Sequence, residues 1–476
     1  MGKRKKITIG YKYFFGIHMG ICRGPVNSLV AIKVGGRIAW QGNQTSSGTF
    51  YINNPDLFGG EKKEGGIQGP FTVMMGEPDQ GMNTDLERMI NQGSGSGPRT
   101  LPNFRGMLTA FYDGLVSSMS PYPKKWEFRV RRTTKGWTND QPWYPEKALI
   151  LLHSGSQEIH AMNPAHIIYE CMTNKEWGRG LDPSMLDVQS FRDCADTLFE
   201  EGFGLCLVWR RKDTIDQFVQ LVIDHIGGAM FTDRMTGLIK LKLIRNDYVA
   251  ASVPLYTTDS GLLEVQEAVV ASNSGVINQV EIKYLDPIEN EERTVKVHNL
   301  AAIQAAGGTF NAISKTYNGI PTSDLALRVA QRELMMASYP LRRFKLVFDR
   351  RAWRINPGDV LRISNPERAL GDLVLRVGRI EDGTLTNGRI TITAVQDVFA
   401  LPLSAFSKYE PPQWAPPDLT PDLKRHRTFE MPYFLLNRIM SPADFDTISN
   451  ESGFVGAVAE KPTPLSTGYD LNVEAT

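Results

Sequence analysis

The segment Asn163–Leu181, NPAHIIYECMTNKEWGRGL, carries the residue types that most suggest chemistry. His166 and Glu170 stand four residues apart, the spacing that places two side chains on one face of a helix. A zinc site needs at least three protein ligands, and no H-E-x-x-H motif is present. His153 and His160 lie nearby, in a predicted strand and a predicted loop. The sequence therefore favours the polar surface of a core-packed helix over a metal site.

Serine and cysteine nucleophiles find little support. Gly93–Gly97, GSGSG, matches the letters of a nucleophile elbow, but no apolar strand precedes it, so we expect a loop. Three cysteines fall on predicted apolar faces, where cysteine acts as a small hydrophobic residue. These are Cys171, Cys194 and Cys206. Cys22 adjoins Arg23, a setting that can lower a thiol pKa, but no histidine signature accompanies it.

Phosphate-binding and carboxylate chemistry are also weakly supported. The glycine pairs Gly59–Gly60 and Gly65–Gly66 lack the Gly-Lys-Ser/Thr end of a phosphate-binding loop. Carboxylate pairs for glycoside hydrolysis are made in space rather than in sequence, so a cell-wall hydrolase stays an alternative. We expect no enzyme activity, and we assign no catalytic, cofactor-binding or metal-binding residues.

Length and charge limit the classes of protein to which this chain can belong. The 476 residues suffice for about three domains. Lys and Arg number 53 against 52 Asp and Glu, so the chain is no general polyanion binder. The basic run Lys3–Lys6 leaves nucleic-acid binding as a second alternative. No apolar stretch fits a signal peptide or a membrane span. Four cysteines without CxxC spacing indicate free thiols made in a reducing cytoplasm.

The first 150 residues are predicted to form a β-domain. Residues 28–40 favour two strands joined at Gly35–Gly36, and residues 126–132 alternate between apolar and charged types. The intervening segment, about 43–122, is rich in Gly and Pro. We expect this segment to be a large insertion of turns and extended loops.

Residues 151–250 are predicted to form an α+β domain. Asn163 and Pro164 are a typical helix start, and further helices are expected with faces at 188–199 and 215–226. The alternation at Phe203–Trp209 predicts a half-buried strand, and a hairpin is expected over 229–244.

Residues 251–410 are predicted to be rich in strands again. Short strands are expected at 280–284, 294–297, 344–348, 360–363, 373–377 and 389–393, which suits a small antiparallel barrel or sandwich. One helix, capped by Thr322 or Ser323, interrupts them and ends before Pro340. The prolines at 411–412 and 416–417 predict a stiff linker, so 411–476 reads as a linker and the start of a further module or tail segment.

Several segments, in this order, resemble the tip attachment or central hub proteins of long-tailed bacteriophages and related tail-like particles. Near the N-terminus the chain has CRGPVNSL and IKVGGRIAW, followed by the glycine-rich LFGGEKKEGGIQG and LPNFRG. NPAHIIYE with WGRG is similar to a signature of that family, and WRINPGDV and AVQDVF resemble its barrel strands. The marks run from about residue 15 to 400.

The resemblance implies a β-rich α+β fold, with two small antiparallel β-barrel domains flanking an α+β domain. It implies a homotrimer at the distal tip of the tail that closes the tail tube, attaches tip fibres and opens for DNA ejection. The implied partners are a distal tail protein ring, the tape-measure protein, other tip proteins, receptor-binding fibres and DNA in transit. The chain would be made in the host bacterial cytoplasm and reside in the virion, without stable membrane insertion or a cofactor.

Overall fold

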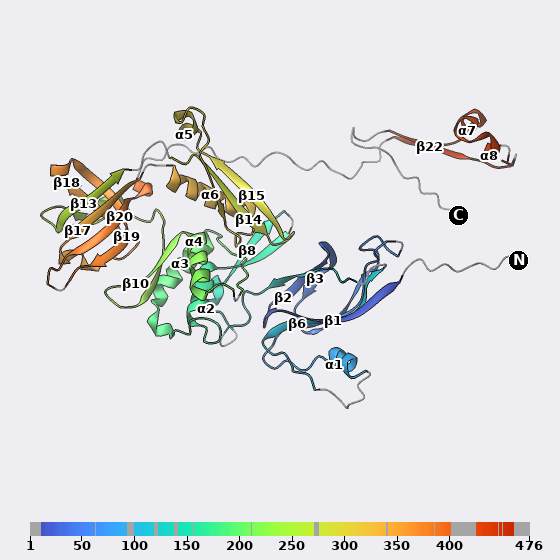
Figure 1. The fold of residues 1–476 in the computed structure, drawn as a ribbon, viewed down its shortest axis with the longest axis horizontal. Helices are drawn as coiled ribbons and strands as arrows, with labels where there is room; N and C mark the ends of the chain where they lie inside the picture. The colour runs from blue at the N-terminus through green and yellow to red at the C-terminus, as the bar shows by residue number, and fades with distance from the viewer. Residues whose placement is uncertain are drawn as a thin grey trace. The chain divides into compact units, whose positions relative to one another are not determined.

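A computed structural model describes residues 11–61, 63–92, 100–118, 122–137, 141–155, 157–210, 212–270, 276–338, 341–384, 386–400, 425–445, 447–449 and 451–460. The chain divides into two units, residues 1–406 and 407–476 (Figure 1). Lys3–Lys6, Gly93–Gly97 and the proline pairs at 411–412 and 416–417 lie outside the described residues.

The described residues of the first part of unit one form seven strands and one helix. They are β1 (Lys12–Arg23), β2 (Ser28–Val34), β3 (Arg37–Gln44), β4 (Gly48–Asn54), β5 (Ile67–Met74), α1 (Thr84–Asn91), β6 (Met107–Ser118) and β7 (Trp126–Arg131). One sheet has the order β1-β6-β5-β4 and the other β3-β2-β7. Both bury apolar side chains in a shared core that includes Phe71, Tyr112 and Ile32.

The expectation of loops over residues 43–122 is wrong. This segment contains β4, β5, α1 and β6, and its strands supply most of the sheet that includes β1. Two of its glycines allow close strand packing, because a Cβ on Gly69 would meet the Asp113 carbonyl at 2.6 Å and one on Gly114 the Gln68 carbonyl at 2.5 Å. A strand glycine that permits close backbone approach has the same sequence signature as a loop glycine.

The central part packs helices against short strands. Its elements are β8 (Leu149–Ser154), β9 (Gln157–Met162), α2 (Pro164–Thr173), α3 (Val188–Glu200), α4 (Ile215–Ile226), β10 (Gly228–Thr232) and β11 (Ile239–Leu243). The three predicted helices and the hairpin are confirmed. The strand predicted at Phe203–Trp209 is wrong, since only Leu205 makes a bridge, to Met162. Its apolar residues alternate because they pack on the helical core rather than in a sheet.

A later segment shares this helical core. It comprises β14 (Gln279–Asp286), β15 (Glu291–His298), α5 (Leu300–Ala305), β16 (Ala312–Thr316) and α6 (Ser323–Ala337). Thr322 caps α6 as expected, accepting from the Leu325 amide. Val280, Ile282 and Leu334 join the same core as α2 to α4, and the later strands have a core of their own. The predicted strand-rich region is therefore interrupted by this whole segment, and not by one helix alone.

A six-stranded sheet completes unit one. Its strands are β12 (Leu255–Tyr256), β13 (Leu262–Val270), β17 (Arg342–Phe348), β18 (Val360–Asn365), β19 (Leu370–Asp382) and β20 (Ile390–Gln396). The order is β12-β18-β19-β20-β17-β13, antiparallel apart from the β12–β18 pair. The fold is therefore mixed α+β and rich in strands, as expected, while the boundaries at 150, 250 and 410 stay predictions.

The second unit is small. It contains β21 (His426–Glu430), α7 (Tyr433–Ile439), α8 (Pro442–Phe445) and β22 (Val455–Ala459), and β21 pairs with β22. Over the described parts of both units, every helix is too short or too polar to cross a bilayer.

Candidate functional site

Helix α2 begins where the sequence predicts. The Asn163 side chain accepts a hydrogen bond from the Ala165 amide at 3.1 Å, and Pro164 occupies the first helical turn. The Asn163 amide also donates to the carbonyls of Lys147 and Ala195, at 3.0 and 2.9 Å. One asparagine therefore caps α2 and ties it to the neighbouring segments, which positions His166 and Glu170.

His166 lies in the core rather than on a polar surface. Its side chain is 0% exposed, and its Nε2 hydrogen-bonds the Tyr144 carbonyl at 2.8 Å, so Nε2 carries the proton. The ring of Trp143 lies 5.0 Å away and that of Trp137 6.2 Å away. Burial lowers the pKa of His166 to about 4, which the hydrogen bond to Tyr144 opposes. A neutral, enclosed imidazole of this kind supports packing rather than proton transfer to a ligand.

Glu170 is also buried, at 5% exposure, but it has a different partner. Arg132 donates to both of its carboxylate oxygens, at 2.6 and 3.2 Å. The two residues therefore do not converge on a common ligand, and the expectation of a polar helix surface is wrong for both. The sequence signal was hidden because Arg132 lies 38 residues away.

The two other histidines considered as metal ligands do not join a metal-binding group. His153 is exposed on β8, and His160 on β9 contacts Glu158 at 2.5 Å. Within the described ranges, no three His, Cys, Asp or Glu side chains gather in a metal-binding group.

The four cysteines are free thiols, two of them buried. Cys22 is exposed, but the protein atoms around its sulfur still raise its pKa to about 11 by desolvation, and the charge of Arg132 opposes this only in part. The expectation that its surroundings can activate this thiol is therefore wrong. Burial likewise raises the pKa of Cys194 and of Cys206 to about 12 and moves the pKa of Cys171 upward.

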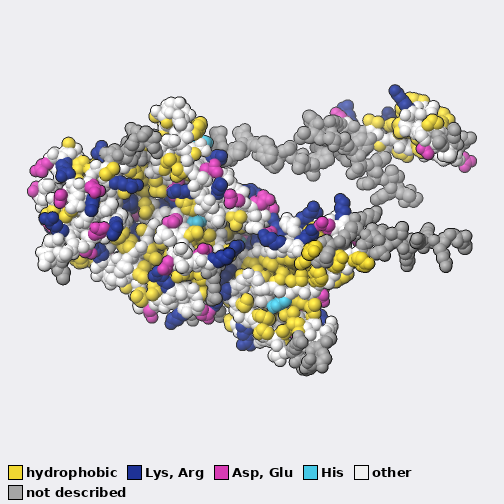
Figure 2. Space-filling model, viewed as in Figure 1, with side chains coloured by type: hydrophobic (Ala, Val, Ile, Leu, Met, Phe, Trp, Pro, Cys, Tyr) yellow, Lys and Arg dark blue, Asp and Glu magenta, His cyan; other side chains and the backbone are white. Residues whose placement is uncertain are grey.

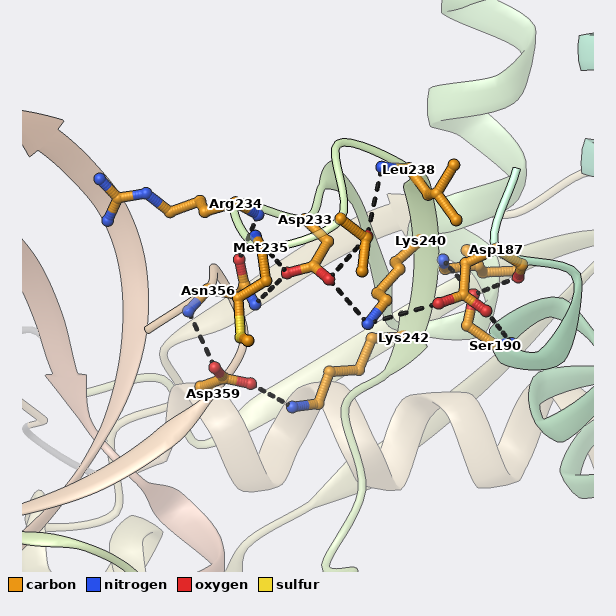
Figure 3. Close-up of polar contacts among 12 residues, drawn as sticks. Asp187, Ser190, Asp233, Arg234, Met235, Leu238, Lys240, Lys242, Asn356 and Asp359 are labelled. Carbon is orange, nitrogen blue, oxygen red and sulfur yellow. Dashed lines mark hydrogen bonds and ion pairs between the residues drawn. The ribbon is translucent and has the colours of Figure 1, made fainter. Parts of the chain in front are cut away.

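A denser polar cluster lies around the β10–β11 hairpin, and we call it the hairpin junction (Figure 3). It comprises Asp187, Asp233, Lys240, Lys242, Asn356 and Asp359. Asp233, 3% exposed, accepts from Lys240 at 3.0 Å, Asn356 at 2.8 Å and Thr236 at 2.9 Å. Burial disfavours the Asp233 carboxylate, but these hydrogen bonds outweigh it and hold its pKa well below the usual range.

The junction links three parts of unit one. Lys240 also reaches Asp187, the N-cap of α3, at 3.3 Å, so it lies between two carboxylates. This arrangement raises the pKa of Lys240, with the Asp233 hydrogen bond as the largest cause. Lys242 pairs with Asp359 at 2.7 Å, in the turn that leads into β18. The cluster thus holds the hairpin against both α3 and the six-stranded sheet.

The sequence predicts a hairpin over 229–244 and a strand at 360–363 but does not indicate that the turns beside them meet. A partial signal was present, because Lys240 and Lys242 alternate on one strand behind an aspartate-containing turn. Every carboxylate of the junction already has a cation or amide partner, so the geometry serves rigid assembly rather than acid–base catalysis.

A comparison with protein families finds one match. Residues 245–380 match a family described as "Putative phage tail protein". That segment includes the Asn356–Asp359 side of the hairpin junction and most of the six-stranded sheet. No curated protein matches the chain.

One chain of a solved virion structure has a similar fold, and two tail-protein structures align with lower scores. A chain from the virion of a native gene transfer agent particle aligns with a TM-score of 0.52 at 15% identity, over 83% of this chain and 84% of that one. A tail protein from Neisseria meningitidis MC58 aligns at 9% identity and TM-score 0.32, over 78% and 96%. The 43 kDa tail protein of prophage MuSo2 from Shewanella oneidensis aligns at 11% identity and TM-score 0.28, over 78% and 98%.

Proposed function

We propose that this chain is a structural protein of a phage-type tail and that three copies form the central hub at its distal tip. The observation that carries the proposal is the fold likeness to a gene transfer agent virion chain over 83% of the sequence. The family match at residues 245–380 supports the same class. The ordered sequence marks between about 15 and 400 favour the hub position within the tail.

The architecture suits a load-bearing assembly part. In this proposal the two sheets of β1 to β7 and the six-stranded sheet are two small β-barrel domains. The helical core, which includes α2 to α4 and also β14 to α6, is the α+β domain. Buried ion pairs such as Arg132–Glu170 and Lys240–Asp233 fix neighbouring elements in one arrangement. Such pairs specify geometry more than they add stability.

The proposed partners follow from that position. The hub would contact a distal tail protein ring and the tape-measure protein on one side, and tip proteins and receptor-binding fibres on the other. DNA would pass through its lumen during ejection, and a net charge of +1 suits a conduit that does not retain a polyanion. The role requires no catalytic residue or cofactor.

Oligomeric state tests the hub directly. Light scattering of the purified full chain across a wide concentration range should give three times the 53.2 kDa of one chain. A peptidoglycan zymogram run beside it should show no clearing. A monodisperse monomer at all concentrations would argue against the hub, and a clearing zone would favour the hydrolase.

A further inference from the structure

Strand β1 has an unpaired edge. It spans Lys12–Arg23 and is the first strand in the order β1-β6-β5-β4, so β6 is its only partner among the described strands. Bulges lie near its two ends, and Phe14 to Gly20 pair with β6 without a break. Among the described residues, no backbone hydrogen bond reaches its outer edge.

Beside this edge lies a row of apolar side chains that we call the β1 row: Tyr13, Phe15, Ile17, Met19 and Ile21. All five pack against the core of the first two sheets, yet all are only partly buried. Figure 2 shows hydrophobic side chains gathered over this part of the molecule.

The opposite side of the two sheets is closed. There β3 contacts β4, and the rings of Trp40 and Phe50 stack at 4.3 Å. At the β1 side, β7 ends the facing sheet, and β2 is its one pairing partner among the described strands. Among the described strands, β1 and β7 are therefore the two edges on this side that pair with no further strand.

The devices that normally protect an edge are missing from the middle of β1. Natural edge strands carry proline, inward-pointing charges or a short length. KYFFGIHMGICR contains no proline and no acidic residue, and its Lys and Arg stand only at the two ends. A strand of this length with free backbone groups and an apolar row is a template for strand addition.

The charges decide which kind of strand fits. In an antiparallel pair of two β1 strands over their full length, Lys12 of each copy would face Arg23 of the other. Like charges directly opposite are destabilising, so a second copy is disfavoured. Both cations now contact exposed carboxylates, Lys12 with Glu61 and Arg23 with Glu176. Acidic residues on an incoming strand can replace these weak surface pairs.

We propose that the free edge of β1 binds an extended segment of another protein, which adds as a fifth strand. Its alternate side chains are apolar and cover the β1 row, and acidic residues at its ends face Lys12 and Arg23. The inference rests on the proposed function only for the identity of the donor, a neighbouring tail protein. The apolar and charged contacts proposed for the added strand follow from the residues of β1 alone.

A synthetic peptide tests the edge in the full-length chain. The probe has the length of β1, with valine and threonine alternating and glutamate at both ends, and fluorescence anisotropy follows its binding. We expect saturable binding of one peptide per chain. A control peptide with lysine at both ends should bind roughly fivefold more weakly, as two exposed ion pairs predict. Absence of saturable binding, or equal binding of both peptides, overturns the proposal.

Two matched variants locate the binding face. Met19→Lys places a cation in the β1 row, and Phe14→Lys places one on the opposite face of the same strand, where Phe14 is 64% exposed. Met19→Lys should weaken binding by about tenfold or more, the loss expected for one apolar contact, and Phe14→Lys should change it by less than about twofold. Thermal unfolding checks that both variants fold. Equal losses in the two variants contradict the proposal.

Light scattering distinguishes binding of another protein at this edge from self-association of this chain. We expect Met19→Lys to keep the oligomeric state of the unmodified chain. Conversion of an oligomer to a monomer by Met19→Lys would assign the edge to self-association and overturn the proposal. If the chain proves absent from a tail tip while peptide binding keeps its Met19 dependence, the proposed function fails and the docking edge stands.

Discussion

Asp233 at the hairpin junction offers a sharp test of how the parts of unit one are held together. Replacing it with asparagine keeps its shape but removes the charge that faces Lys240 and puts an amide donor among the Lys240, Thr236 and Asn356 donors. The Asp233 side chain is 3% exposed, whereas Lys240 is 29% exposed, so water can compensate the lysine charge only in part. Breaking a buried pair by removing one partner costs about 3–5 kcal/mol. Because Lys240 keeps its contact with Asp187 at 3.3 Å, we expect the lower end, about 3 kcal/mol.

The matched control is Asp382→Asn. Asp382 contacts the neighbouring hairpin residue Arg234, but its side chain is 63% exposed. Exposed pairs contribute about 0–1 kcal/mol. Hydrogen exchange of the full chain, followed by mass spectrometry, should show faster exchange at 228–243 and 356–360 for Asp233→Asn only. Urea unfolding should show the matching loss of free energy. A loss of free energy for Asp233→Asn no greater than that for Asp382→Asn would refute the conclusion that the hairpin junction holds the hairpin against α3 and the six-stranded sheet.

Three further outcomes follow from the buried groups. Arg132→Met leaves the Glu170 carboxylate buried without its cation, and urea unfolding should show a loss of about 3 kcal/mol or more; a loss under about 1 kcal/mol would contradict the burial of that pair. The pKa values of His166 and His225 lie at about 4 in the folded chain, below their ordinary 6.5, so the unfolded chain binds more protons between these values. Stability should therefore fall as the pH drops from about 6.5 towards 4, by about 1.4 kcal/mol per pH unit for each histidine, and a variant with asparagine at both positions should lose this slope. Cys194, which is buried and has a pKa of about 12, should react with a disulfide reagent more slowly than free cysteine at pH 7.5, and equal rates would contradict its burial.

Local signals predicted much of the fold. Asn163–Pro164 marks the start of α2 because an asparagine cap and a proline in the first turn act within a few residues. Thr322 marks α6 in the same way. The strands of the six-stranded sheet carry apolar alternation between recognisable turns, so β17 to β20 were found near their true positions.

Long-range pairing could not be predicted from one sequence. Phe203–Trp209 alternates like a strand, but the alternation reports burial against helices, and a strand also needs a partner. The Asp233–Asn356 contact joins residues 123 positions apart, which no local pattern encodes. The burial of His166 and Glu170 escaped prediction for the same reason, since their partners come from segments before α2.

The most direct test of the hub proposal is an electron-microscope image of the tail particle that contains this chain, with the chain located by a specific antibody label. The proposal predicts label at the distal tip of the tail, with threefold symmetry in the averaged density there. Label along the tube, on the head, or nowhere on the assembled particle would contradict it.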